Sequence, residues 1–250
     1  MNPQTPKRVI VNLKSPTKSE HDKAVEGLFS GIARWYDFLN HLLSLGIDLY
    51  WRRQLALAVN PGQGLVLDLA AGTLDVARAL KRHYPFITVP ALDFCPTMLK
   101  LGLGKLNSEQ ALSILPVGAD AKHLPLPPNT VDAITIAFGI RNIVPREEAF
   151  SEMLRVLKPG GHVYILEFGS GQERIWGGLY NWYLNKILPR IGQLLAKDKK
   201  AYQYLAETIG AFPPAAKFEA EMQEAGFVNT KFRKLTSGIA CLHLGQKPYS

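Results

Sequence analysis

Residues 65–75 read Leu-Val-Leu-Asp-Leu-Ala-Ala-Gly-Thr-Leu-Asp, and a second apolar run at residues 87–92 is followed by Asp93. An apolar run, small residues and then a more polar segment predict a buried strand, a tight turn and a helix. Small residues in the turn let the backbone approach a ligand, and an acid about 20 residues further on can accept hydrogen bonds from ribose hydroxyls. The pattern therefore predicts a nucleotide-binding half of an open α/β sheet and a ligand built on adenosine.

The same alternation of strand and helix continues along the chain. We expect strands at residues 64–69, 87–92, 113–118, 131–137 and 161–167, and helices at residues 75–83, 96–107 and 146–157. Lys158-Pro-Gly-Gly161 is expected to stop the last of these helices in a tight turn. Such alternation predicts a parallel sheet with helices on both faces.

Two apolar runs near the C-terminus, residues 227–235 and 238–244, look like adjacent strands at the sheet edge. A helix at residues 215–225 is expected to precede them. With these strands the expected fold is α/β, with an open, doubly wound and mostly parallel sheet of seven strands.

One domain fits the chain best. Residues 1–20 look like a flexible basic arm, and residues 21–250 are expected to form the domain. Within it we expect an N-terminal helical cap at residues 21–60, with its second helix at 48–59, and a helical insertion at residues 172–211 before the last strands.

Composition bounds the class of protein. Of 250 residues, 47% are apolar and 20% charged, which is ordinary for a globular protein. No run approaches the roughly 18 apolar residues of a membrane span, and the N-terminal stretch has too short an apolar run for a secretory signal. Cys95 and Cys241 are too few and too far apart to predict a disulfide framework or a metal site. We therefore expect a protein of the reduced cytoplasm.

The excess positive charge is unevenly placed. The net charge is +8, and residues 173–200 carry six bases and two acids, half of that excess. Within residues 173–195, aromatic side chains interleave with apolar ones, as in helices that lie at a membrane interface. The alternative is a buried helix whose Lys and Arg side chains reach outwards. We favour an anionic membrane surface as partner over nucleic acid.

Polar residues at the first two strand ends are candidate ligands of the adenosine-like molecule. Asp68, Gly72 and Thr73 lie at the first strand-to-helix turn, where α/β folds bind ligands. Asp93 is expected to bind the ribose, although it could instead cap the helix that begins near Pro96.

Two further loops carry candidates whose spacing leaves both alternatives open. Asp120 and Ala121 follow the third strand, where a carboxylate could accept from an adenine amine or merely form a turn. Arg141 and Asn142 follow the fourth strand, where they could hold a water or an anionic substrate oxygen, or Arg141 could form a structural salt bridge. His243 is more typical of a core histidine than of a base.

Several motifs resemble those of the ubiquinone/menaquinone biosynthesis C-methyltransferase family, within the class I S-adenosylmethionine-dependent methyltransferases. The most specific motifs are Phe29-Ser-Gly-Ile-Ala-Arg-Trp-Tyr-Asp-Phe-Leu-Asn40 and Phe138-Gly-Ile-Arg-Asn142. Others are Arg155-Val-Leu-Lys-Pro-Gly-Gly161, Leu188-Pro-Arg-Ile-Gly192, Tyr202-Gln-Tyr-Leu-Ala-Glu207 and Leu235-Thr-Ser-Gly-Ile239 with His243. The resemblance extends over nearly the whole chain beyond the basic arm.

The resemblance implies a Rossmann-like methyltransferase fold and S-adenosyl-L-methionine as cofactor. It implies a cofactor site at Thr73, Asp93, Asp120 and Ala121, with Ala137 where relatives often have serine. The implied reaction is carbon methylation of a polyprenylated quinol ring, a demethylmenaquinol or a related benzoquinol or naphthoquinol. The ring and tail stay open, as does the oligomeric state, with a homodimer among the alternatives.

The implied chemistry suggests roles for three residues. A quinol hydroxyl, with a pKa of about 10 by analogy with tyrosine, is mostly protonated at neutral pH. Its deprotonation raises electron density at the adjacent ring carbon, which attacks the methyl group. We expect Arg141 to stabilise the phenolate, Asn142 to orient a water, and Tyr36 to close over the ring.

The sequence departs from the family pattern in the cofactor loop. Leu74 replaces a glycine, while Asp48 and Gly169 replace a histidine and a serine. Leucine disfavours a positive φ and adds a branched side chain, so it either packs among the helices or narrows the pocket. We expect a cofactor site that is retained but weakened.

Two other functions compete with quinol methylation. A nicotinamide-dependent oxidoreductase shares the ribose-binding acid, but the first turn lacks G-x-G-x-x-G. A relative that has lost the cofactor and acts as a lipid-quinone-binding or assembly subunit is supported only by Leu74. We expect the methyltransferase, associated peripherally with the inner face of a membrane and without a metal ion.

Overall fold

The computed structural model describes residues 11–12, 20, 23–31, 44, 46–62, 64–169, 204 and 207–249 of the 250-residue chain, residues 11–12 by backbone alone. Tyr36, the expected interfacial segment 173–195, and most of the arm and the insertion lie outside the described residues. Residues 23–31, at the start of the expected cap, are helical.

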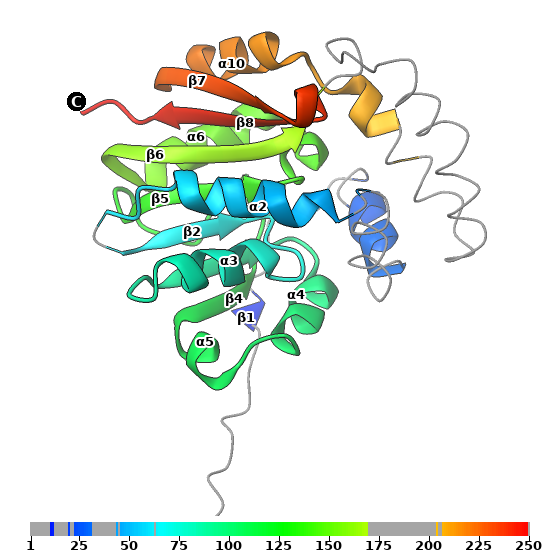
Figure 1. Cartoon of the computed structure of the whole chain (residues 1–250), viewed down its shortest axis with the longest axis vertical. Coiled ribbons are helices and arrows are strands. Elements are labelled where there is room, and N and C mark those ends of the chain that lie inside the picture. The colour runs from blue at the N-terminus through cyan, green and yellow to red at the C-terminus, as the bar shows by residue number, and fades with distance from the viewer. Residues whose placement is uncertain are drawn as a thin grey trace, which may run out of the picture.

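A single twisted sheet forms the centre of the described structure (Figure 1). Its strands are β1 (Val11–Asn12), β2 (Val66–Leu69), β3 (Val89–Asp93), β4 (Ile114–Gly118), β5 (Val131–Ala137), β6 (Leu157–Phe168), β7 (Val228–Leu235) and β8 (Ala240–Gln246). Their order is β1-β4-β3-β2-β5-β6-β8-β7. All neighbours are parallel except β6–β8 and β8–β7, so the predicted open, mostly parallel sheet is confirmed.

The central position of β2 in the sheet explains why its sequence is so apolar. All four of its residues are buried, because β2 is flanked by β3 and β5 and covered by helices on both faces. The strand order reverses between the neighbouring strands β2 and β5, and this switch point opens a crevice at the carboxyl ends of the strands.

The sheet has one strand more than expected. Val11 and Asn12, predicted to belong to the flexible arm, pair with Val117 and Gly118 of β4. The β-branched run Val9-Ile10-Val11 favours extended backbone, and its addition covers the otherwise open edge of β4.

Helices cover both faces of the sheet. They are α2 (Ile47–Ala58), α3 (Asp75–His83), α4 (Pro96–Leu103), α5 (Ser108–Ser113), α6 (Arg146–Val156) and α10 (Ala215–Glu224), with 3-10 turns η1 (Ile140–Asn142) and η4 (Thr236–Gly238). Figure 1 shows α2 and α3 side by side in front of the sheet and α6 behind it. One core cluster lies under α2 and α3, and a second under α6 and α10.

Two local expectations were wrong. The helix expected to reach residue 107 ends at Leu103, and a separate helix, α5, starts after Asn107 because Asn107 and Gln110 form a capping box. The Lys-Pro-Gly-Gly turn lies within β6, which already begins at Leu157; Gly160, with φ 76°, and Gly161 exchange backbone hydrogen bonds with Lys247.

Candidate functional site

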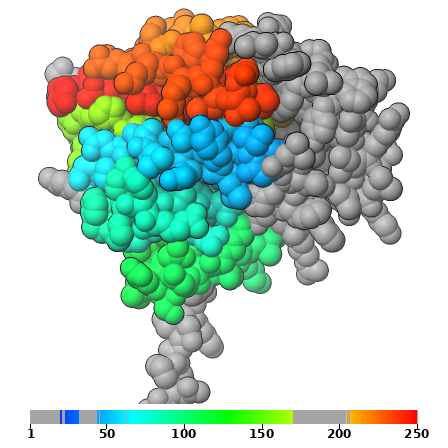
Figure 2. Space-filling model, viewed as in Figure 1, coloured from blue at the N-terminus to red at the C-terminus, as the bar shows by residue number. Residues whose placement is uncertain are grey.

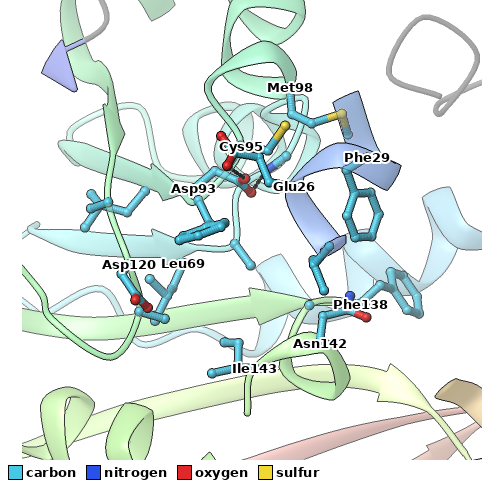
Figure 3. A pocket seen from close by; sticks show the side chains of 18 of the residues that line it. Glu26, Phe29, Leu69, Asp93, Cys95, Met98, Asp120, Phe138, Asn142 and Ile143 are labelled. Atoms are coloured by element: carbon cyan, nitrogen blue, oxygen red, sulfur yellow. Dashed lines mark hydrogen bonds between the residues drawn. The ribbon is translucent and has the colours of Figure 1, made fainter. Parts of the chain in front are cut away.

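A pocket opens at the carboxyl edge of the sheet, at the switch point. Its empty space, counted together with its open mouth, is about 800 Å³. The loops after β2, β3, β4 and β5 line it together with residues of the helix at 23–31. Figure 3 shows Phe29 and Met98 at one side of the hollow and Asp120 and Leu69 at the other.

Asp93 is the central acid of the pocket. Its Oδ2 accepts a hydrogen bond of 2.7 Å from the Gly72 N–H, and its Oδ1 one of 2.7 Å from the Cys95 N–H (Figure 3). Asp93 therefore joins the first turn to the N-terminus of α4, whose cap residue is Cys95 and not Asp93. A carboxylate has about four acceptor positions, so its oxygens keep acceptor capacity towards the pocket.

Burial makes Asp93 chemically unusual. It raises the pKa of the Asp93 carboxyl to about 6, although the hydrogen bonds from Cys95 and Gly72 act in the opposite direction. The carboxylate is thus costly to bury and gains from any ligand that donates hydrogen bonds to it. A vicinal pair of ribose hydroxyls has this donor chemistry.

The turn after β2 has a left-handed backbone at three positions. Ala70, Gly72 and Leu74 have φ values of 54°, 52° and 66°. Of these, Ala70 and Gly72 line the pocket, whereas Leu74 does not. The strain that Leu74 tolerates is typical of a turn held by its surroundings.

Leu74 packs among helices and leaves the pocket open. Its side chain has no exposed surface, and it fills the space beside Gly102 of α4, where a Cβ atom would lie 2.6 Å from Leu74 Cγ. We predicted that Leu74 would narrow the pocket and weaken cofactor binding, but its side chain does not line the pocket. The backbone keeps the positive φ, and the side chain is accommodated on the side of the turn away from the pocket.

The loop after β4 brings Asp120 and Ala121 to the pocket wall. Asp120 Oδ1 accepts a hydrogen bond from the Lys122 N–H at 2.9 Å, so the turn that is the alternative to adenine binding is present. Glu152 fixes the continuation of the loop by accepting from the Leu124 N–H at 2.7 Å, while Arg155 donates to the Leu124 carbonyl at 2.9 Å. The wall is therefore a rigid surface against which a planar ring could lie.

The end of β5 supplies the opposite wall. Ala137, Phe138 and Asn142 line the pocket, and Phe138 has a left-handed φ of 58°. The Phe138 ring packs against Phe168 in a tilted arrangement, with 4.6 Å between centroids, and its centroid lies 6.0 Å from that of Trp51 of α2. This aromatic cluster was not predicted, because its members come from three distant segments.

Arg141 is buried behind this wall in an ion pair. Its Nη1 donates to Glu167 Oε1 at 2.8 Å and to the Phe138 carbonyl. Its backbone N–H donates to Glu167 Oε2 at 3.4 Å. Arg141 does not line the pocket. The structural salt bridge, the alternative to a substrate contact, is thus present.

Asp68 and Thr73 lie behind the turn. Asp68 accepts from the Thr135 hydroxyl at 2.8 Å and the Ala77 N–H at 3.1 Å, and burial raises its pKa to about 7. The Thr73 hydroxyl accepts from Lys105 Nζ at 2.9 Å. Neither side chain lines the pocket, so both hold the turn that presents Gly72.

The sequence predictions missed several lining residues. Glu26 and Phe29 come from the helix at 23–31, and Cys95 and Met98 from the start of α4. Tyr204 is a further neighbour, whose hydroxyl donates to Asn142 Oδ1 at 3.1 Å. Phe29 opens the N-terminal motif and Tyr204 lies in another, so the motifs held a signal for both. The expected catalytic Tyr36 lies outside the described residues.

The described part of the chain contains neither a metal-binding cluster nor a membrane-spanning helix. There, no group of histidine, cysteine, aspartate and glutamate side chains is arranged to hold a metal ion. Likewise, no helix among the described residues has the length and apolarity to cross a bilayer.

The chain is similar to known methyltransferases over nearly its whole length. The model of the ubiE/COQ5 methyltransferase family matches residues 16–247. A ubiquinone/menaquinone biosynthesis C-methyltransferase of Geobacter sulfurreducens is 41% identical over 232 residues, covering 92% of this chain and 90% of that protein. A demethylmenaquinone methyltransferase of Thermus thermophilus is 41% identical over 222 residues, covering 88% of this chain and 100% of that protein.

Solved structures share the fold at low identity. An S-adenosylmethionine-dependent methyltransferase of Thermotoga maritima superposes with a TM-score of 0.62 at 18% identity, covering 88% of this chain and 98% of that one. A phosphoethanolamine N-methyltransferase of Haemonchus contortus, solved with S-adenosyl-L-methionine, gives a TM-score of 0.58 at 16% identity, covering 82% and 57%. These likenesses concern the fold alone.

Proposed function

Because the chain belongs to the ubiE/COQ5 methyltransferase family, we propose that it transfers a methyl group from S-adenosylmethionine to a ring carbon of a polyprenylated quinol. The ring is a demethylmenaquinol or a related benzoquinol or naphthoquinol, and the reaction belongs to quinone biosynthesis. The observation that carries the proposal is the 41% identity over 232 residues to a relative with that activity in its name, together with a pocket at the switch point.

The residues of the pocket fit S-adenosylmethionine. Asp93 would accept hydrogen bonds from the ribose hydroxyls, and the Gly72 turn allows close approach of backbone. Asp120 and Ala121 would face the adenine, and Ala137 would form the floor. When bound, the cofactor supplies a methyl group on a positively charged sulfur.

The chain's own groups would prepare the quinol. Loss of the hydroxyl proton to a water would increase electron density at the neighbouring ring carbon, the position that would receive the methyl group the cofactor supplies. Asn142 lines the pocket and would orient a water or the quinol oxygen. Tyr36 is proposed to close over the ring.

Arg141 is better placed as a positioning residue than as a direct contact. Its guanidinium donates to the Phe138 carbonyl, just before the η1 turn that carries Asn142, and to Glu167 of strand β6. Fixing this turn fixes the Asn142 amide, and small displacements of positioning groups have large effects on rate.

Access to a polyprenylated substrate requires contact with a bilayer, so we propose peripheral association with an anionic membrane surface. The charge and aromatic pattern of residues 173–195 supports this part of the proposal.

The alternative of a lipid-binding relative without cofactor loses its support, because Leu74, its only sequence argument, does not line the pocket. The nicotinamide alternative disagrees with the family, and that hypothesis was wrong.

The test is methyl transfer by the purified full-length chain from labelled S-adenosylmethionine to a short-tailed demethylmenaquinol, with mass spectrometry of the product. We expect a quinol heavier by one methyl group on a ring carbon. Cofactor binding without transfer to any naphthoquinol or benzoquinol would contradict the proposal.

A further inference from the structure

A second groove lies between α2 and α3, on the sheet face opposite α6 and α10. Its empty space, counted together with its open side, is about 1310 Å³. Basic side chains dominate its wall, with a single acid, Asp75: the bases are Arg52, Arg53, Arg78, Arg82, His83 and Lys105. None of the residues that line this groove lines the pocket at the switch point.

The positive charge of the groove is only partly compensated. Asp75 pairs with Lys105 at 2.9 Å and with Arg78 at 3.6 Å, and Arg52 pairs with Asp48 at 3.6 Å. Within the described ranges, no carboxylate lies within ion-pair distance of Arg53 or Arg82. The groove therefore attracts anions.

The outer face of α2 adds apolar surface beside these charges. Leu49, Tyr50 and Leu57 are 54%, 51% and 42% exposed. Leu49, Arg53 and Leu57 are spaced four residues apart, so they form one stripe along the helix with the arginine between the leucines. Exposed leucine and tyrosine next to arginine are typical of surfaces that enter the headgroup region of a bilayer.

The basic surface extends from α2 onto the edge strand β7. Arg233 donates to Gln54 of α2 at 3.0 Å, and Lys231, on the same side of the strand, is also exposed. Figure 2 views this face, with α2 and α3 at its centre and β7 above them. Basic side chains on both sides of an apolar stripe are typical of an extended docking surface and not of a site for one small molecule.

We propose that the α2–α3 face docks on phosphate headgroups of an anionic lipid surface. The proposal rests on the proposed function, because a polyprenylated quinol resides in a bilayer. α2 also connects the face to the pocket: the Arg52 guanidinium lies 5.2 Å from the centre of the Phe138 ring, which lines the pocket. Docking through this face would hold the pocket close to the membrane surface.

Vesicle flotation of the full-length chain tests the proposal. We expect binding to vesicles of phosphatidylglycerol and phosphatidylcholine that weakens as salt is added, and little binding to phosphatidylcholine alone. Arg53→Gln with Arg82→Gln should weaken binding at least tenfold, since each basic group near an anionic surface contributes about fivefold in affinity. Leu49→Ser with Leu57→Ser should also weaken it.

Matched controls separate this face from general effects. Lys217→Gln removes one charge from an exposed position of α10, and Leu112→Ser changes an exposed leucine of α5. Both should bind vesicles like the wild type. All variants should methylate a water-soluble, short-tailed quinol at the wild-type rate, so a failure of methylation in the wild type would contradict the proposed function and leave the docking result readable.

Three outcomes would overturn the proposal. They are unchanged vesicle binding by the double arginine variant, an equal loss in the Lys217→Gln control, and binding to polyuridylate that exceeds binding to the vesicles. The last would assign the face to nucleic acid.

Discussion

Leu74 and Gly102 are complementary: the leucine side chain occupies the volume that a side chain at position 102 would need, with 2.6 Å between Leu74 Cγ and a Cβ placed on the glycine. The leucine replaces the small residue expected in the cofactor turn, and a glycine 28 positions later in α4 makes room for it. The compensation lies in helix packing, and the pocket keeps its shape.

The first prediction follows from this pair. Leu74→Gly should destabilise the fold by about 1–4 kcal/mol, because a cavity costs about 2–5 kcal/mol and relief of the left-handed backbone returns about 1 kcal/mol. Affinity for S-adenosylmethionine should change less than about threefold. Urea unfolding and calorimetry measure the two effects, with Leu80→Ala in α3 as a control for destabilisation. A tenfold gain in affinity would instead show that Leu74 narrows the pocket.

The second prediction uses the pKa of about 6 that burial gives Asp93. The ionised form accepts hydrogen bonds from ribose hydroxyls, so cofactor affinity should reach a plateau above pH 6 and fall about tenfold per pH unit below it. Asp93→Asn should bind at least tenfold more weakly at pH 8 and show no such dependence. Calorimetry in two buffers of different ionisation enthalpy measures the released proton. A wild-type affinity that is flat between pH 5 and 8 would place the ribose elsewhere.

The strands and helices could be predicted because their signals are local. The apolar runs of β2 and β5 and the helical spacing of α3 are properties of short windows, and the chain order of such elements restricts the sheet to few topologies. Helix α5 was not predicted, although Asn107 and Gln110 stand at the spacing of a capping box.

The site could be predicted only in part, because its remaining determinants lie far apart in the sequence. Asp93, Asp120 and Asn142 follow strands and could be placed at one edge. Whether Arg141 faces the pocket depends on Glu167, and whether Leu74 narrows it depends on Gly102. Spacing carries no information on either pairing.

The third prediction concerns the buried pair of Arg141 and Glu167. Glu167→Gln leaves the guanidinium without its partner and should cost about 3–5 kcal/mol of stability. The double variant Arg141→Met with Glu167→Met should recover most of that loss, because apolar groups need no charge partner. In the double variant we expect kcat to fall while the Kd for S-adenosylmethionine stays constant, since the turn carrying Asn142 loses its support. An unchanged kcat in a folded double variant would leave the ion pair with a structural role only.

The last prediction concerns His243, whose buried ring lies between Phe218, at 4.9 Å, and Phe232, at 5.7 Å. Burial lowers the pKa of His243 from 6.5 to about 4, so the unfolded chain binds a proton more readily than the folded chain between these values. The contribution of His243 to stability is therefore present above pH 6.5 and is lost as the pH falls towards 4, by about 3 kcal/mol in total.

Asp68 and Asp93 have raised pKa values of about 7 and about 6, and their protonation stabilises the fold over an overlapping range. The pH dependence of wild-type stability alone therefore combines these opposite contributions. The difference between wild type and His243→Leu in urea unfolding isolates the histidine: the variant should gain on the wild type as the pH is lowered from 6.5 to 4. Parallel curves for the two proteins would mean that the ring finds a partner for its proton in the folded state.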